Sequence, residues 1–361
     1  MLEAPLFAFL GALMVNLTMT PWVIRILRDR DMLDIPNARS SHDTPTPRGG
    51  GIVIVATWCL GMVSTWALRF PLPNLGILAP DGFVISATIG MCVLAILGYV
   101  DDRRDLNPIL KLIIQIAVGA QALYLSGLRL ADPGLPFGIS WDLGPWGWLF
   151  GLVWLVGFTN IYNFMDGING LAFTQLIFGG TTFCMLGVST GDYELAISGA
   201  LAAGSAAGIL KYNFPKANVF MGDVGTLPIG FLLALMGLRA AFGPRSQGIS
   251  FIIPVLILWP FLYDGTFTLI NRLVHGRNPV RPHRSHLYQR LLVLGLSHQS
   301  ITIRYGLAMI FCSVAGFGMQ YYSLQISQML LAVILLFSGF YTYRTVRKVR
   351  AHETQNGNPE T

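Results

Sequence analysis

Apolar segments of membrane-spanning length alternate with short polar segments along the whole chain. Because a transmembrane helix needs about 20 apolar residues, the pattern predicts eleven membrane spans. They cover residues 5–27, 50–69, 83–100, 109–128, 145–164, 171–189, 194–211, 221–240, 249–271, 301–321 and 325–344. Between the fourth and fifth spans, alternating Phe137, Ile139 and Trp141 predict a small β-hairpin. We expect an all-α polytopic membrane protein with a single domain over residues 1–361.

Basic residues are distributed unevenly between the two sets of alternating loops. Twenty of the 24 lysines and arginines fall on one set, which includes the C-terminus. The other set holds only Arg69, Arg129, Arg239 and Arg245. Since cytoplasmic loops carry the excess of basic residues, we expect the N-terminus and the hairpin outside. The C-terminal tail, residues 345–361, is expected in the cytoplasm.

The composition excludes a soluble enzyme. Of the residues, 53% are hydrophobic and 12% are charged, whereas a soluble domain has about a quarter charged residues. The four cysteines lie inside apolar runs, with neither the spacing of a metal site nor that of a disulfide framework. The lipid bilayer is therefore an expected partner, and nucleic acid is not.

The most informative polar stretch lies at the end of the fifth predicted span. It runs from Asn160 to Leu171 and contains Asn163, Asp166 and Asn169. Polar side chains are costly to place at the end of a membrane segment and often mark a functional site. The alternative is a polar turn between two helices, with Asn163 and Asp166 as caps.

The first cytoplasmic loop ends in Arg48 and the three glycines 49–51. Exposed backbone N–H groups and an arginine at a helix N-terminus suit an anion. The alternative is a tight, glycine-rich entry into the next helix.

The second cytoplasmic loop begins with the adjacent carboxylates Asp101 and Asp102. Such a pair suits a general base or an indirect hold on a divalent metal, unless Arg103 and Arg104 make it an ordinary solvated loop. Lys111 follows one turn into the next helix, where it could meet a phosphate or extend toward the membrane surface.

Two further carboxylates and a basic loop complete the set. Asp223 begins the eighth span and could be an N-cap. Asp264 lies inside the ninth span and needs a buried partner, which indicates a structural or supporting role. In the last loop, His283, Arg284 and His286 are donors that fit a diphosphate, with too few ligands nearby for zinc.

All these clusters lie on the predicted cytoplasmic side. Magnesium binds one or two carboxylates together with substrate phosphates, so the pattern indicates phosphoryl-transfer chemistry at the cytoplasmic membrane surface. The oxygen ligands available to a metal are those of Asp101, Asp102, Asp166, Asn169 and Asp223. The phosphate-type donors are Arg48, Lys111, His283 and Arg284.

Four motifs in this order resemble the polyprenyl-phosphate N-acetylhexosamine-1-phosphate transferases (glycosyltransferase family 4), the superfamily of phospho-N-acetylmuramoyl-pentapeptide translocase. They are Pro45-Thr-Pro-Arg-Gly-Gly-Gly51, Asp101-Asp102 with Leu106-x-Pro108-x-x-Lys111, Asn160-x-x-Asn163-x-x-Asp166-Gly-x-Asn169-Gly-Leu171, and Phe220-Met-Gly-Asp223-Val-Gly225. The final loop, from His283 to Arg290, is similar to that of the branch making O-antigen and capsule linkage lipids.

The resemblance implies a bacterial inner-membrane enzyme that transfers a sugar-1-phosphate from a UDP-amino sugar to undecaprenyl phosphate and releases UMP. It implies Mg²⁺, for which Mn²⁺ could substitute. By position, Asp101 and Asp102 would activate the lipid phosphate, and Asp166, Asn169 and Asp223 would surround the metal. The substrate contacts would come from Arg48, Lys111, Asn160, Asn163, His283, Arg284 and His286. Three questions stay open: which sugar is transferred, whether the protein forms a homodimer, and whether the attack is direct or passes through a covalent intermediate.

One departure from the family pattern matters. Many members carry aspartate at the position of Asn169. An asparagine can still bind magnesium through its carbonyl, but it cannot act as a base or a nucleophile.

The strongest alternative is a transporter for an anionic solute or a lipid-linked sugar. It predicts ionisable residues near the bilayer midplane and broken helices in repeated halves, for which Asp264 and the glycines of residues 199–208 are the sole candidates. A CDP-alcohol phosphatidyltransferase would need several aspartates along one helical segment. Asp166 is the only aspartate on its segment.

Overall fold

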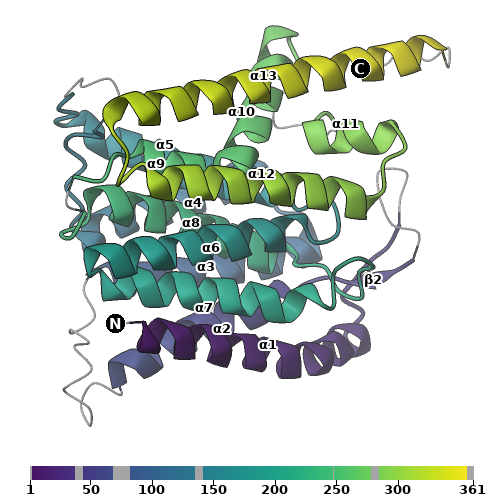
Figure 1. Ribbon diagram of the computed structural model, residues 1–361. Helices are drawn as coiled ribbons and strands as arrows, with labels where there is room; N and C mark the ends of the chain where they lie inside the picture. The colour runs from purple at the N-terminus through teal and green to yellow at the C-terminus, as the bar shows by residue number, and fades with distance from the viewer. Residues whose placement is uncertain are drawn as a thin grey trace.

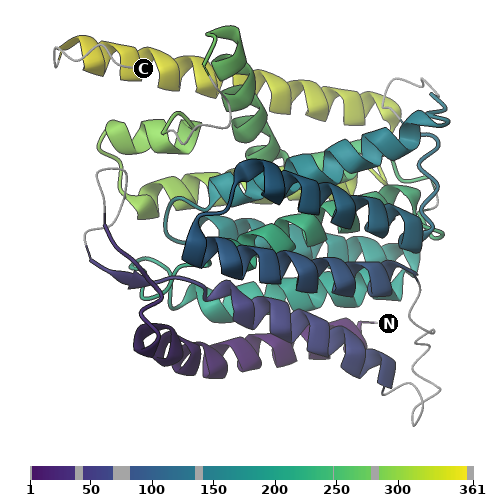
Figure 2. The same cartoon turned by 180° about the vertical axis from the view of Figure 1, so that it is seen from behind.

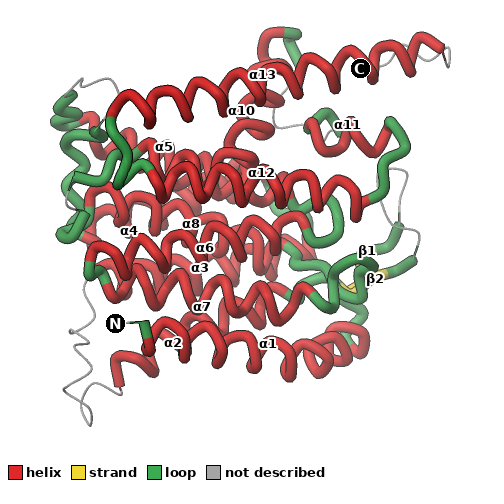
Figure 3. Tube along the Cα trace, in the orientation of Figure 1, coloured by secondary structure: helices red, strands yellow, loops and turns green. Residues whose placement is uncertain are grey.

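The computed structural model describes residues 2–36, 44–67, 82–134, 141–246, 248–277 and 284–355. Within these ranges the chain is a bundle of helices with one short two-stranded sheet at one end (Figures 1 and 3). The helices are α1 (Glu3–Asp29), α2 (Gly51–Ala67), α3 (Gly82–Arg104), α4 (Pro108–Ser126), α5 (Trp146–Met165), α6 (Leu171–Thr190), α7 (Tyr193–Leu210), α8 (Asp223–Phe242), α9 (Ile252–Ile257), α10 (Trp259–Val274), α11 (Leu287–Val293), α12 (His298–Gly318) and α13 (Leu324–Gln355). The strands are β1 (Leu33–Asp34) and β2 (Thr46–Pro47).

The structure confirms an all-α polytopic membrane protein. Among the described residues, nine helices are long and apolar enough to cross a membrane: α1, α3 to α8, α12 and α13. A tenth predicted span, 50–69, is the shorter apolar helix α2 (Gly51–Ala67).

The predicted span 249–271 is wrong as one continuous helix. The chain breaks at Leu258 into α9 and α10. Pro260 stands at the start of α10; proline has no N–H to donate, and its ring clashes with the carbonyl four residues earlier. After the break, α10 runs across the direction of the neighbouring helices (Figures 1 and 2).

The two ends of the chain lie at opposite ends of the bundle (Figure 1). This agrees with an odd number of crossings, while the side that faces the cytoplasm stays a prediction from the basic residues. The expected tail from residue 345 begins as a continuation of α13, which extends to Gln355.

The predicted hairpin depends largely on residues 135–140, which lie outside the described residues. Its described flanks, residues 127–134 and 141–143, contain no strand. The sheet in the described part of the chain is elsewhere: β1 pairs antiparallel with β2, with Leu33 opposite Pro47 and Asp34 opposite Thr46.

Helix α8 is the centre of the bundle. Every one of its residues is buried, because α2, α3, α5, α6, α7 and α9 all pack against it. A helix of membrane length is thus enclosed by protein rather than lipid. Its first residue, Asp223, is held in place by the whole core.

Glycines allow neighbouring backbones to meet at the start of α8. A Cβ on Gly98 of α3 would overlap the carbonyl group of Asp223, and a Cβ on Gly225 would lie 2.6 Å from the Cα of Gly51. Three helix ends therefore approach one another with no side chain between them.

The glycines of α7 have a similar packing role. A Cβ on Gly208 would lie 2.6 Å from the carbonyl oxygen of Leu13 in α1, and a Cβ on Gly199 would meet the backbone of α6. These glycines belong to close helix packing, so they give no support to the transporter alternative.

We expect Gly98→Ala to destabilise the protein, because the added methyl group forces α3 away from the start of α8. Overpacking of this kind costs about 1–3 kcal/mol. Thermal unfolding of the detergent-purified protein measures this loss of stability. Gly157→Ala in α5 is the matched control, since a Cβ there meets nothing within 4 Å; equal unfolding midpoints for the two variants would contradict the prediction.

Candidate active site

A cleft of about 670 Å³ opens at the end of the bundle where the first loop, the end of α5 and the start of α8 meet. The residues lining it also come from α11, α12 and the loop before α8. Six residues predicted from the sequence line this cleft: Arg48, Asn163, Asp166, Asn169, Asp223 and Arg284. Segments far apart in the sequence thus meet in one cavity.

Asp223 connects the groups around it. Its Oδ1 accepts a hydrogen bond from Arg48 Nη2 at 2.9 Å and another from Asn163 Nδ2 at 3.1 Å. Its carboxyl group also lies within hydrogen-bonding reach of Asp101. A side-chain exposure of 13% leaves this carboxylate open to the cleft.

Asp102 fixes the N-terminus of α8. Its Oδ1 accepts the backbone N–H of Asp223 at 3.0 Å, and its Oδ2 accepts that of Val224 at 3.1 Å. The first N–H groups of a helix lack partners within the helix, and a carboxylate there also interacts favourably with the helix dipole.

Arg48 completes this arrangement by pairing with both carboxylates. Its Nε lies 2.8 Å from Asp102 Oδ1, and the Asp102 side chain is only 1% exposed. Burial alone would lower the pKa of Arg48, but Asp102, Asp223 and Asp34 outweigh it and raise the pKa above its ordinary value. The guanidinium is therefore firmly cationic at the edge of the cleft.

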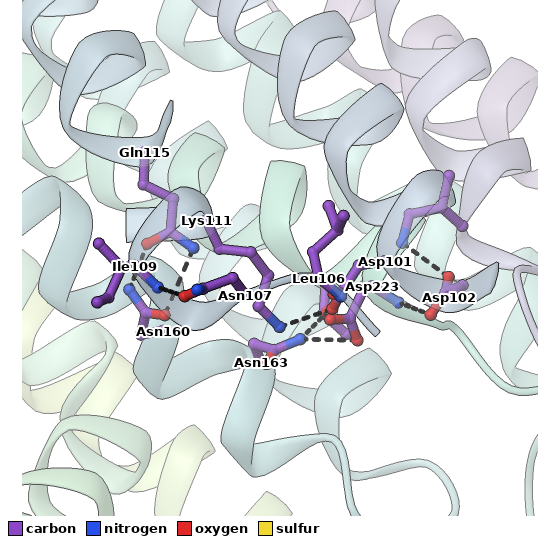
Figure 4. Close-up of polar contacts among 12 residues, drawn as sticks. Asp101, Asp102, Leu106, Asn107, Ile109, Lys111, Gln115, Asn160, Asn163 and Asp223 are labelled. Atoms are coloured by element: carbon purple, nitrogen blue, oxygen red, sulfur yellow. Dashed lines mark hydrogen bonds and ion pairs between the residues drawn. The ribbon is translucent and has the colours of Figure 1, made fainter. Parts of the chain in front are cut away.

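Asp101 points toward α4 rather than toward Arg48. Its Oδ2 accepts from Lys111 Nζ at 2.7 Å, and its Oδ1 accepts from the N–H of Leu106 at 2.8 Å (Figure 4). On α5, Asn160 Nδ2 donates to Gln115 Oε1 at 2.5 Å.

The predicted residues therefore form two groups. Asp101, Asp102, Lys111 and Asn160 do not line the cleft. Figure 4 shows Asp101 and Lys111 beside Asp223 and Asn163, which join this second group to the cleft.

Asp166 directly follows the last residue of α5 and lines the cleft. Burial raises its pKa to about 8; Arg48 opposes the shift, and the carboxylates of Asp223 and Asp102 add to it. This crowding of negative charge favours a bound cation.

The turn after Asp166 is fixed by its neighbours. Asn169 Nδ2 donates to the carbonyl oxygen of Pro215 at 3.0 Å, and Thr302 Oγ1 donates to the carbonyl oxygen of Asn169 at 2.8 Å. The N–H of Gly170, a residue with φ of +80°, donates to Asn213 Oδ1. With its amide nitrogen engaged, Asn169 has its Oδ1 to offer a ligand.

The donor set fits an open magnesium site. The described residues hold no cluster of three or more His, Cys, Asp or Glu side chains able to bind a metal. Asp166 and Asp223 nevertheless provide two carboxylates in one cleft. Magnesium typically takes one or two carboxylates and completes its shell with water and substrate phosphates.

The expectation that the glycines 49–51 present N–H groups to an anion is wrong. The N–H groups of Gly49 and Gly50 donate to the carbonyl oxygen of Phe220, at 3.2 and 2.9 Å, and that of Gly51 donates to Met221 O at 2.9 Å. The glycines instead let the first loop lie against the segment before α8.

The structure describes only one of the two histidines that were predicted to contact substrate in the last loop. His283 lies outside the described residues. His286 is buried, with its Nδ1 3.2 Å from Asp264 Oδ1, and does not line the cleft. The structure thus gives His286 a different contact from the diphosphate or sugar contact that the resemblance implied.

Sequence reasoning did not single out several residues that line the cleft: Asp34, Asn213, Thr226, Gln289 and His298. Asp34 shares the first loop with Arg48, and Thr226 lies one turn after Asp223, so their positions gave some signal. Asn213, Gln289 and His298 reach the cleft only through tertiary packing.

The chain is similar to known polyprenyl-phosphate transferases. The family model described as Glycosyl transferase family 4 matches residues 84–241. A protein of Bacillus subtilis named probable undecaprenyl-phosphate N-acetylglucosaminyl 1-phosphate transferase is 29% identical over 336 residues, covering 91% of this chain and 89% of its own.

Two more relatives cover most of the chain. The decaprenyl-phosphate N-acetylglucosaminephosphotransferase of Mycobacterium tuberculosis is 31% identical over 306 residues, covering 78% of this chain and 74% of its own. The undecaprenyl-phosphate alpha-N-acetylglucosaminyl 1-phosphate transferase of Escherichia coli is 28% identical over 339 residues, with 88% and 85% covered.

We expect Asp102→Asn to lower the stability of the protein by about 1.5–3 kcal/mol, the range for a hydrogen bond to a charged group. The amide cannot accept from Arg48 and from both N–H groups of α8. Thermal unfolding measures the loss. Asp105→Asn removes an exposed carboxylate nearby and should leave the unfolding midpoint unchanged; a comparable loss in both variants would refute the capping role.

Proposed function

Because the chain belongs to the polyprenyl-phosphate sugar-1-phosphate transferases of glycosyl transferase family 4, we propose that it transfers an N-acetylhexosamine-1-phosphate from a UDP-sugar to undecaprenyl phosphate. UMP is the second product. The observation that carries the proposal is the cluster in which Arg48 and Asn163 both bond Asp223 beside Asp166. It offers cations, carboxylates and amides to a diphosphate and a metal in one cleft.

The chain and its relatives support a biological setting for the proposal. The relatives are named for undecaprenyl or decaprenyl phosphate and N-acetylglucosamine. The basic loops favour a cytoplasmic cleft, where nucleotide sugars are available. The reaction is then the first membrane step of O-antigen or another cell-envelope polysaccharide, in the bacterial inner membrane.

Different residues of the cleft bind the metal and the diphosphate. Asp166 and Asp223 would hold Mg²⁺, for which Mn²⁺ could substitute, and Asn169 would support it through its side-chain Oδ1. When bound, the metal neutralises charge on the transferring phosphate. Arg48 and Arg284, both at the cleft, bind the diphosphate oxygens.

The chemical step is an attack of a lipid phosphate oxygen on the sugar-linked phosphorus. A new bond forms between that oxygen and the phosphorus, and the bond from the phosphorus to the oxygen of UMP breaks. Any proton on the attacking phosphate passes to Asp101. Lys111, 2.7 Å from Asp101, draws the lipid phosphate to this position.

Asp101 is a better candidate for the base than Asp102. Both oxygens of Asp102 already accept from the N-terminus of α8, and one of them also pairs with Arg48. Asp101 is joined to Lys111 and lies within reach of Asp223. Asp101 accepts from one lysine side chain and one backbone N–H, and it is easier to free for proton transfer than a carboxylate that caps a helix and also pairs with an arginine.

The first test is an assay of the purified chain with undecaprenyl phosphate, Mg²⁺ and a panel of UDP-amino sugars, with UMP as the readout. We expect UMP release that requires lipid, stops with EDTA and returns with Mg²⁺. Asp223→Ala should abolish it, because that carboxylate joins the metal site to Asp101. UMP release that survives EDTA or Asp223→Ala would contradict the proposed site.

The second test concerns the base. We expect Asp101→Asn to lower kcat by about 10²- to 10⁴-fold, the usual contribution of a general base, with binding of the UDP-sugar retained. Asp105→Asn serves again as the control. If the attack is direct, no covalent adduct between the enzyme and the phospho-sugar forms in the absence of lipid. Detecting such an adduct by mass spectrometry would rule out direct attack.

A further inference from the structure

A buried carboxylate joins the crossing helix α10 to the short helix α11. The Asp264 side chain is 1% exposed. Its Oδ1 accepts the N–H of Leu287 at 2.8 Å, and its Oδ2 accepts the N–H of Tyr288 at 3.1 Å. These are the first two residues of α11, so one side chain fixes the position where this helix begins.

Two aromatic side chains bring further elements to the same carboxylate. Tyr305 of α12 donates its hydroxyl to Oδ2 at 2.6 Å, and His286 Nδ1 lies 3.2 Å from Oδ1. His286 Nδ1 faces Oδ1 of this carboxylate, an oxygen that can only accept hydrogen bonds when the group is ionised. Asp264 therefore links α10 to α11 and α12.

Helix α11 forms part of the cleft wall. Gln289, Leu292 and Val293 line the cleft, and Arg284 precedes the helix. On its other side, Tyr288 donates its hydroxyl to the carbonyl oxygen of Phe164, near the end of α5. Gly167 leaves the room that this hydroxyl occupies. The position of α11 thus sets where Arg284 and Gln289 stand relative to Asp166.

We infer that Asp264 is a positioning residue for the nucleotide-sugar side of the cleft: it holds α11 in place and touches no substrate. His286 shares this task through its bond to Asp264. The inference rests on the proposed function, because that proposal assigns the cleft to the sugar nucleotide. It also accounts for the one carboxylate in the ninth predicted span.

The test compares Asp264→Asn with Thr268→Val in the full chain, using UDP-N-acetylglucosamine as the probe. The amide keeps the shape of the carboxylate but turns an NH₂ group toward the N–H of Leu287 or of Tyr288. We expect the Kd without lipid and the KM to rise about tenfold, with kcat within about threefold of the original.

Thr268 is the matched control. Its hydroxyl donates to the same Asp264 Oδ1 at 3.3 Å, but from within α10. Thr268→Val removes that bond without touching α11, so Kd and KM should not change. A rise of the same size in this variant would overturn the inference.

A purely structural role would give a different result. Asp264→Asn would then lower the unfolding midpoint or the fraction of active protein, with Kd and KM unchanged, and this outcome refutes the inference. If Asp264→Asn does not fold, Tyr305→Phe carries the test, with KM expected to rise about threefold; an unchanged KM there also refutes it. A folded original protein that releases no UMP instead refutes the proposed function.

Discussion

The bridge that Arg48 makes between Asp102 and Asp223 is the interaction on which the site depends. It joins the first loop, the end of α3 and the start of α8, at 2.8 Å to one carboxylate and 2.9 Å to the other. Because α8 is buried along its whole length, Asp223 cannot shift without moving the core. Functional groups on such rigid elements keep their geometry, and the loops of the cleft are arranged around this fixed point.

Neighbouring aspartates in this site have different tasks because a helix turns about 100° per residue. Asp102 faces the first loop and the N-terminus of α8, while Asp101 faces Lys111 on α4. One carboxylate therefore stabilises the structure around Arg48, and the other pairs with Lys111 beside Asp223. The close backbone contacts at Gly51, Gly98 and Gly225 bring both aspartates near the cleft.

The sequence predicted much of this arrangement, because spans and their polar ends follow from local hydrophobicity. Of the residues expected together in one site, six line one cleft: Arg48, Asn163, Asp166, Asn169, Asp223 and Arg284. Five others that were expected there do not line it: Asp101, Asp102, Lys111, Asn160 and His286. The need of Asp264 for a buried partner was also foreseen, since an isolated charge in a span is costly.

What the sequence could not predict depends on tertiary partners. The N–H groups of the glycines 49–51 are taken by the carbonyls of Phe220 and Met221, which no local pattern reveals. His286 turns inward because Asp264 lies 22 residues earlier on the crossing helix. The break at Leu258 follows from Pro260, a signal that was present but outweighed by the apolar run.

The most direct test of the account is an experimental structure of the full chain with Mg²⁺ and a UDP-N-acetylhexosamine bound. We expect the metal on the carboxylates of Asp166 and Asp223, the diphosphate between Arg48 and Arg284, and Asp102 still bonded to the N-terminus of α8. A nucleotide bound outside this cleft, or a metal held by neither carboxylate, would contradict it.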